Sequence, residues 1–195
     1  MKKLILITLC LTAGLTYAAT EVLQPGPGEA EDVYIWEREP HTNYEDNILA
    51  CGYATGFMHT LICFAELDDP RFDDCTVNNA TLALYTDSVP WGTPPLDATF
   101  YMIVESWDPA TITWSSRPVR DWGTTLTYSF NYYGDWHNID VTTFVSSWVE
   151  DDCSNYGLIF GSNSTDKYVG YGFCHGEETS HPEYRPKLII DYDTD

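Results

Sequence analysis

The chain has 195 residues, of which 30 are acidic and nine are basic, so its formal net charge at pH 7 is -21. This charge argues against nucleic acid and anionic membrane surfaces as partners, because phosphate groups need Lys and Arg to displace their counterions. With seven Trp and 14 Tyr, the chain is also too aromatic to be a disordered acidic polymer.

The N-terminus has the features of a secretory signal peptide. Lys2 and Lys3 precede an apolar stretch from Leu4 to Leu15, and small residues follow near Ala18. We therefore predict a signal peptide over residues 1–18, cleaved near Ala18 or Ala19. Its removal would leave seven of the nine basic residues.

The remaining chain suits one domain. We expect an extended leader over residues 19–31 and a single β-sandwich domain over residues 32–195. No later apolar run approaches the roughly 20 residues of a membrane span. The sequence thus predicts a soluble protein without membrane insertion, secreted to the extracellular space, the periplasm or the cell surface.

Short runs with strand-like alternation follow the leader, separated by Pro, Gly, Asn and Asp. We expect strands over residues 32–36, 60–65, 80–85, 99–105, 111–114, 125–133, 156–161, 167–174 and 187–192. Residues 140–149 differ, because their apolar positions follow helical spacing. Asp140 or Thr142 can cap this helix, which we expect near residues 142–149. The pattern predicts an all-β fold, an antiparallel, jelly-roll-like β-sandwich with one short helix.

Five cysteines lie beyond the signal peptide, and export would permit disulfides. A hairpin turning near Asn163 would bring Cys153 close to Cys174. A hairpin turning near Phe57 would place Cys51 opposite Cys63. Both pairings are within disulfide reach if these registers hold, and Cys75 is then the odd cysteine.

The order of several short motifs resembles the DNRLRE-domain family, which is related to carbohydrate-binding module family 96. The motifs are Asp32-Val-Tyr-Ile35, Asn43-Tyr44, Leu61-Ile-Cys-Phe64 with Leu67, Ala80 to Tyr85, Trp107-Asp108 with Thr111 to Trp114, Pro118, Ile139 to Thr142 with Val145 and Trp148, Gly157-Leu158, and Pro186 to Leu188 with Tyr192. The resemblance implies a secreted β-sandwich of a kind found attached to extracellular enzymes and in adhesin-like proteins. Some members of the family bind polysaccharide.

The chain departs from the family pattern in one motif and in its charge. Cys63 replaces the usual Arg before Phe64. An acidic, alginate-like polysaccharide would need a basic surface, whereas this chain is strongly acidic. On net charge alone, we expect neutral sugars and weak dependence on salt.

The sequence offers little support for catalysis. Glu105 and Asp108 could act as acid and base on a glycosidic bond at the right separation. We prefer a structural interpretation, because Asp108 precedes Pro109 and Asp side chains close such turns by accepting backbone hydrogen bonds. The segment Trp107 to Trp114 is then scaffold, with Ile112 and Trp114 on one face of a strand and Trp148 as a packing partner of Trp114.

The sequence holds candidate ligands for two kinds of metal ion. Zinc could be approached by Cys174, His175 and His181, without the regular ligand spacing. A structural calcium ion is more plausible for an exported acidic protein. Its candidate ligands form two groups: Asp68, Asp69, Asp73 and Asp74 in one loop, and Glu29 and Glu31 before the first expected strand with Asp191 and Asp193 at the end of the last. A solvated acidic surface is the alternative, and no cofactor is required.

The tryptophans indicate the ligand site. Trp114 and Trp148 fall in strand and helix patterns and are expected in the core. Four others lie in or beside loops and are candidate sugar contacts: Trp36, Trp91, Trp122 and Trp136. Trp91 and Trp122 are favoured because each precedes a Gly in an expected exposed turn, where a flat indole can stack on a sugar ring.

These features predict a secreted, non-enzymatic module that binds polysaccharide or a cell-surface glycan. A structural or adhesin-like protein without specific glycan binding is the alternative, and a glycan-active enzyme is a third. Placement of the aromatic side chains separates the first two, since exposed Trp favours binding and complete burial favours a structural role.

Overall fold

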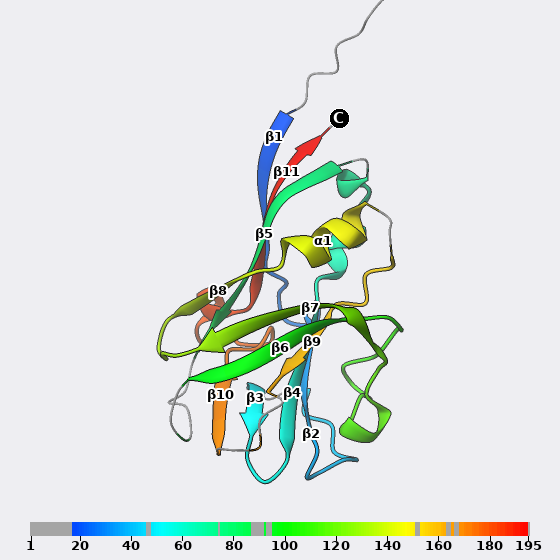
Figure 1. The fold of residues 1–195 in the computed structure, drawn as a ribbon. Coiled ribbons are helices and arrows are strands. Elements are labelled where there is room, and N and C mark those ends of the chain that lie inside the picture. Colours follow the sequence, from blue (N-terminus) through cyan, green and yellow to red (C-terminus); the bar gives the residue numbers. More distant parts are fainter. Residues whose placement is uncertain are drawn as a thin grey trace, which may run out of the picture.

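A computed structural model describes residues 17–45, 48–73, 75–86, 92, 95–150, 153–162, 165 and 168–194. Its strands form two antiparallel sheets accompanied by one short α-helix (Figure 1). This arrangement confirms the expected all-β, sandwich-like fold. The expected signal peptide lies outside the described residues, apart from Tyr17 and Ala18.

The smaller sheet has the strand order β1-β11-β5-β8. Its strands are β1 (Tyr17–Leu23), β11 (Lys187–Thr194), β5 (Cys75–Tyr85) and β8 (Trp136–Asp140). β1 lies in the segment expected to be the end of the signal peptide and the start of the leader. It pairs along its whole length with β11, which continues past Leu188 to Thr194. Cleavage near Ala18 or Ala19 would therefore shorten the outer end of this strand.

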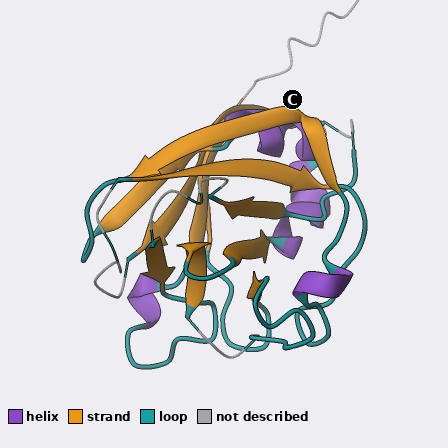
Figure 2. Ribbon diagram, turned by 60° about the horizontal axis from the view of Figure 1, so that its bottom comes forward, coloured by secondary structure: helices purple, strands orange, loops and turns teal. Residues whose placement is uncertain are grey.

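The larger sheet has the order β10-β3-β4-β9-β6-β7, with β2 also paired to β4. Its strands are β2 (Glu31–Trp36), β3 (Leu49–Tyr53), β4 (Phe57–Cys63), β6 (Leu96–Ile103), β7 (Arg120–Phe130), β9 (Leu158–Gly161) and β10 (Val169–Phe173). β7 and β8 are both edge strands, and each has only one sheet partner. The helical segments lie around the strands (Figure 2).

The main core fills the space between the sheets. It includes Phe100, Phe130, Phe160 and Phe173, all fully buried, and Phe100 stacks on Phe160 with ring centroids 4.5 Å apart. A second cluster lies on the other face of the larger sheet, because successive strand residues point to opposite faces. It contains Val33, Ile35, Leu61, Tyr101, Ile103, Ile112 and Ile159, with Trp107, Trp114 and Tyr156 packed against it. The β6–β7 loop covers this second cluster.

The helix α1 spans Thr142–Val149, as the spacing of its apolar residues predicts. Phe144, Val145, Trp148 and Val149 are buried against the main core. Asp140 stabilises its start by accepting hydrogen bonds from the Thr142 backbone N–H (3.0 Å) and hydroxyl (2.6 Å). These two bonds favour the carboxylate and lower the pKa of Asp140.

Residues 111–114 do not form the expected strand. Trp114–Ser116 is a turn of 3-10 helix instead, held by reciprocal hydrogen bonds between Thr113 and Ser116. The turn expected at Asp108 does form, since the Asp108 carboxylate accepts from the Ala110 N–H at 2.9 Å. Trp114 packs on the outer cluster of the larger sheet, whereas Trp148 lies in the main core, so the expected Trp114–Trp148 contact is wrong.

The expected disulfides are also wrong, because no two of the described cysteines are bonded. β9 and β10 are not neighbours, so no hairpin brings Cys153 to Cys174. In the β3–β4 hairpin Tyr53 pairs with Phe57, so the turn is centred two residues before the expected position. In the neighbouring ladders, Cys51 pairs with Tyr171 of β10 and Cys63 pairs with Glu31 of β2, so neither cysteine lies opposite the other.

The thiols should differ sharply in reactivity. Cys153 is exposed, whereas Cys51, Cys63, Cys75 and Cys174 are buried, and burial raises the pKa values of Cys51 and Cys63. We expect a maleimide reagent to label Cys153 first in the folded protein and the other four only after denaturation. Mass spectrometry of labelled peptides will show the order, and a reductant should leave the melting temperature unchanged. A fall in melting temperature with reductant would contradict the thiol assignment.

Candidate functional site

The candidate sugar contacts occupy different environments. Trp91 lies outside the described residues. Trp122 is 67% exposed, the largest exposure among the described tryptophans, while Trp36 and Trp136 are half-buried. Trp122 therefore defines the site that the structure supports best.

Trp122 is lifted out of β7 by an irregularity in the sheet. Thr125 pairs with Tyr101 and Arg120 pairs with Ile103, so residues 121–124 face Met102 alone on β6. The Asp121 carboxylate closes this bulge by accepting from the N–H groups of Gly123 (2.8 Å) and Thr124 (3.1 Å). The expected exposed turn at Trp122 thus exists, but as a bulge within a strand.

A basic side chain lies under the exposed indole. The Arg120 guanidinium carbon is 4.0 Å from the Trp122 ring centroid and 4.3 Å from that of Tyr101. The edges of Tyr101 and Trp122 also meet, with centroids 5.2 Å apart. These contacts fix the orientation of Trp122 while leaving much of its surface open to solvent.

A second pair of the same kind lies beside the first. The Arg117 guanidinium carbon is 4.7 Å from the Trp114 ring centroid, and Arg117 Nη1 donates to the Trp114 carbonyl at 2.8 Å. Trp114 in turn packs against the ring of His59, 5.0 Å away. Burial, together with the charges of Arg120 and Arg117, lowers the pKa of His59 to about 3. His59 is therefore neutral, and the positive charge of the site belongs to the arginines.

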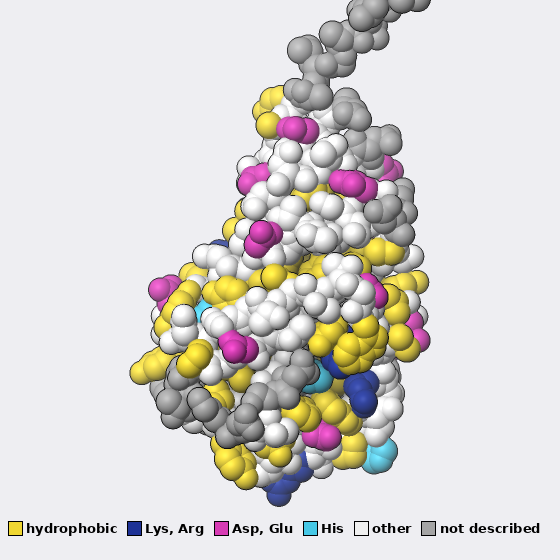
Figure 3. Space-filling view, in the orientation of Figure 1, with side chains coloured by type: hydrophobic (Ala, Val, Ile, Leu, Met, Phe, Trp, Pro, Cys, Tyr) yellow, Lys and Arg dark blue, Asp and Glu magenta, His cyan; other side chains and the backbone are white. Residues whose placement is uncertain are grey.

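Neither arginine forms a salt bridge with a carboxylate of the described residues. Within the described part of the chain, the salt bridges are Arg71–Glu21 and His181–Glu183, both elsewhere. Arg117, Arg120 and Trp122 line an open groove of about 430 Å³ together with Ser115, Pro118 and Val119. On the right of Figure 3, basic and hydrophobic side chains lie together on a face with scattered acidic groups. The groove thus presents two guanidinium groups that form no ion pair with any described side chain, while the nearby Asp121 and Glu105 carboxylates accept backbone N–H groups.

The comparison with known families fits this surface. A model of carbohydrate-binding module family 96 matches residues 28–192. The chain belongs to carbohydrate-binding module family 96. A search of the curated proteins found no significant match. Membership confirms the suspected relation to the DNRLRE-domain family, and it indicates a binding module rather than a catalytic domain.

The other two described candidate sugar contacts, Trp36 and Trp136, are less exposed in this family 96 module. The Trp36 indole N–H is buried and has no hydrogen-bond partner among the described residues, and the Arg38 guanidinium carbon lies 5.8 Å from the ring centroid. Trp136 carries the Lys187 ammonium 4.0 Å from its centroid and meets the edge of Tyr85 at 5.5 Å. Both rings contact the module as Trp122 does, and they differ from Trp122 in being half-buried.

The two carboxylates considered for catalysis have structural partners. Glu105 accepts from the Val119 N–H at 2.6 Å and thereby fastens one wall of the groove. Asp108 closes its turn through Ala110, and Trp107 donates its indole N–H to the Tyr156 carbonyl at 2.8 Å. The segment Trp107 to Trp114 is thus held as scaffold under the groove.

The candidate metal ligands do not converge. Among the described residues, no group of three or more His, Cys, Asp or Glu side chains could hold a metal ion. Glu29, Asp68 and Asp69 share one wide hollow. Asp191 accepts from the Thr20 hydroxyl on β1, so the expected approach of Glu31 on β2 to Asp191 on β11 is absent. Asp74 lies outside the described residues.

Sequence reasoning found Trp122 but missed Arg117 and Arg120. The segment Arg117-Pro-Val-Arg120 holds two of the seven basic residues that follow Lys3. Two arginines so close together in an acidic chain could have indicated a binding site from the sequence alone. The ring contacts that place both side chains at one groove depend on the fold.

Proposed function

We propose that this module binds extracellular polysaccharide in the groove beside Trp122. The observation that carries the proposal is an exposed indole ordered by an arginine, with a second arginine close by and neither of them in a salt bridge with a described carboxylate. A sugar ring can stack its C–H face on Trp122, while the guanidinium groups donate to its oxygens.

The local charge favours a polysaccharide that carries acidic groups. The sequence-based expectation of neutral sugars depended on net charge, but contacts at close range depend on the nearest groups. Arg117 and Arg120 provide those groups here. We therefore propose uronate-containing or sulfated chains as the preferred ligand, with affinity that falls as salt rises.

Family membership and the apolar N-terminal segment support action outside the cytoplasm. In the described residues, no helix has the length and apolar character needed to cross a membrane. A purely structural role is less well supported, because Trp122 is exposed rather than buried. Any part in catalysis would be to hold a polysaccharide near an enzyme.

The decisive variant is Trp122→Ala. Because the side chain is exposed, we expect the melting temperature to stay close to that of the parent. Affinity for retained polysaccharide should fall by about 30-fold or more, the effect of removing an aromatic hot spot. Affinity electrophoresis in gels containing acidic or neutral polysaccharides will measure both retention and preference. Tyr133→Ala is the control, because Tyr133 is another exposed aromatic residue, 55% exposed and outside the groove.

Charge is tested by Arg117→Gln and Arg120→Gln. Each should reduce both affinity for acidic chains and its dependence on salt, whereas Lys187→Gln should change neither. Full retention by Trp122→Ala, or preference for neutral chains at all salt concentrations, would contradict the proposed site.

A further inference from the structure

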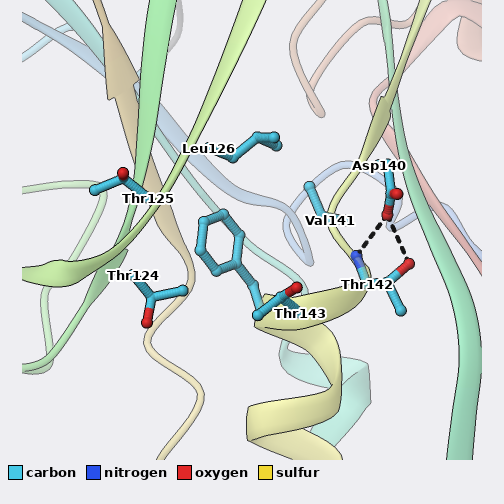
Figure 4. A pocket seen from close by; sticks show the side chains of 8 residues that line it. Thr124, Thr125, Leu126, Asp140, Val141, Thr142 and Thr143 are labelled. Carbon is cyan, nitrogen blue, oxygen red and sulfur yellow. Dashed lines mark hydrogen bonds between the residues drawn. The ribbon is translucent and has the colours of Figure 1, made fainter.

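A second hollow lies where the edges of the two sheets meet. β7 contributes Thr124 and Leu126 to one wall, and the β8–α1 junction contributes Asp140, Val141, Thr143 and Phe144 to the other (Figure 4). Its volume is about 180 Å³. Leu126 and Val141 point toward one another across it in Figure 4. The hollow is therefore built by both sheets rather than by one flexible loop.

The lining combines an apolar floor with two threonine hydroxyls and the Asp140 carboxylate. Phe144 is buried in the main core, and Leu126 is partly buried against it. Within the described part of the chain, the Thr124 and Thr143 hydroxyls make no hydrogen bond. Both bonds from Thr142 reach Asp140 Oδ1, which leaves Oδ2 available as an acceptor.

This chemistry matches a sugar ring better than a lipid or an anion. A pyranose presents C–H groups to an apolar surface and hydroxyl groups to hydrogen-bonding side chains. Hydrogen bonds from Thr142 lower the pKa of Asp140, so its carboxylate is charged at neutral pH. A negatively charged sugar is disfavoured beside that carboxylate.

We propose that this hollow, between β7 and the start of α1, is a subsite for one neutral sugar unit. The hollow and the Trp122 groove lie on opposite faces of the edge strand β7, because Leu126 packs on the main core whereas Tyr101, which meets Trp122, belongs to the outer cluster. Thr124 and Trp122 belong to the same four-residue bulge, so a polysaccharide would reach both sites by crossing β7 there. The inference rests on the proposed function in that both sites serve one polysaccharide. It also predicts selectivity: acidic sugar units bind at Arg117 and Arg120, and a neutral unit binds at Thr124 and Thr143.

Matched monosaccharides test the subsite separately from the groove. Glucose and glucuronate share a ring and differ by one carboxylate. In amide NMR spectra of the ¹⁵N-labelled protein, we expect glucose to shift Thr124, Thr143 and Phe144. Glucuronate should bind there roughly fivefold more weakly or worse, the cost of a like charge a few ångströms away in water.

Isosteric variants test the hydroxyl groups. Thr124→Val and Thr143→Val keep the side-chain volume and should each weaken glucose binding about two- to tenfold. Thr127→Val, at an exposed position of β7 outside the hollow, is the control and should leave binding unchanged. Trp122→Ala should abolish polysaccharide retention while leaving the glucose shifts in place.

The outcomes separate the two proposals. If glucose, galactose and xylose all leave the Thr124 and Thr143 signals unmoved, the subsite is refuted while the groove can still stand. Equal binding of glucose and glucuronate at these residues would overturn the selectivity. If the glucose shifts appear but Trp122→Ala retains polysaccharide fully, the groove fails and the subsite stands.

Discussion

Replacing Asp32 by Asn is expected to stabilise the protein strongly at pH 8 and hardly at all near pH 4. Asp32 is only 4% exposed, and its Oδ2 accepts the Gly176 N–H at 2.7 Å. Burial, assisted by the nearby charge of Glu177, raises the pKa of Asp32 to about 7, although the Gly176 bond opposes this shift. The carboxyl group is therefore more easily ionised in the unfolded chain than in the folded one.

The sign of the effect follows from proton binding. Between pH 4 and pH 7 the folded state keeps a proton that the unfolded state has lost, so stability falls as pH rises through this window. A pKa raised from 3.8 to about 7 corresponds to about 4 kcal/mol of stability present at pH 4 and lost by pH 7. Asn resembles the protonated acid and keeps an oxygen to accept from Gly176, so the variant should avoid this loss.

The measurement is chemical denaturation of parent and Asp32→Asn at pH 4, 6 and 8. Subtracting the unfolding free energy of the parent from that of the variant cancels the contributions of His59 and His137. Their lowered pKa values make stability rise with pH, opposite to the effect of Asp32. Asp97→Asn is the control, because Asp97 is an exposed carboxylate on β6. A difference in stability that stays constant from pH 4 to pH 8 would refute the account of Asp32.

Replacing Trp114 by Ala is expected to cost about 2–4 kcal/mol, somewhat less than a fully buried tryptophan because the side chain is half-exposed. The lost contacts are those with the outer cluster and with His59. Arg117 would also lose the ring beneath its guanidinium, so sugar affinity should fall together with stability. Trp122→Ala, in contrast, should affect affinity alone.

Melting temperature and polysaccharide retention, measured on the same preparations, distinguish these roles. Glu105→Gln and Asp108→Asn should retain sugar binding, because both carboxylates accept backbone hydrogen bonds and an amide oxygen can replace them. Weakening the Asp108 turn should cost around 1 kcal/mol. If Trp114→Ala melts like the parent while Glu105→Gln or Asp108→Asn abolishes function, Trp107 to Trp114 is a site rather than scaffold.

Much of the fold could be predicted from local patterns. The all-β class, most of the strands and the helix at Thr142–Val149 follow from residue periodicity, because one buried face imposes it. Strands β1, β3 and β8 were missed. The sequence of β1 resembles the end of a signal peptide, and it forms a strand by pairing with β11. The sequence of β3, Leu-Ala-Cys-Gly-Tyr, has no alternation of polar and apolar residues.

The sequence by itself determined the fold class, the family resemblance and the exposed Trp122. Tertiary structure decided which strands are neighbours, and it thereby ruled out both expected disulfides and placed Trp114 and Trp148 on opposite faces of one sheet. It also decided the charge of the candidate site. Net charge sums the whole surface, whereas a ligand responds to the nearest unpaired groups, and only the folded chain places Arg117 and Arg120 on the rings of Trp114 and Trp122.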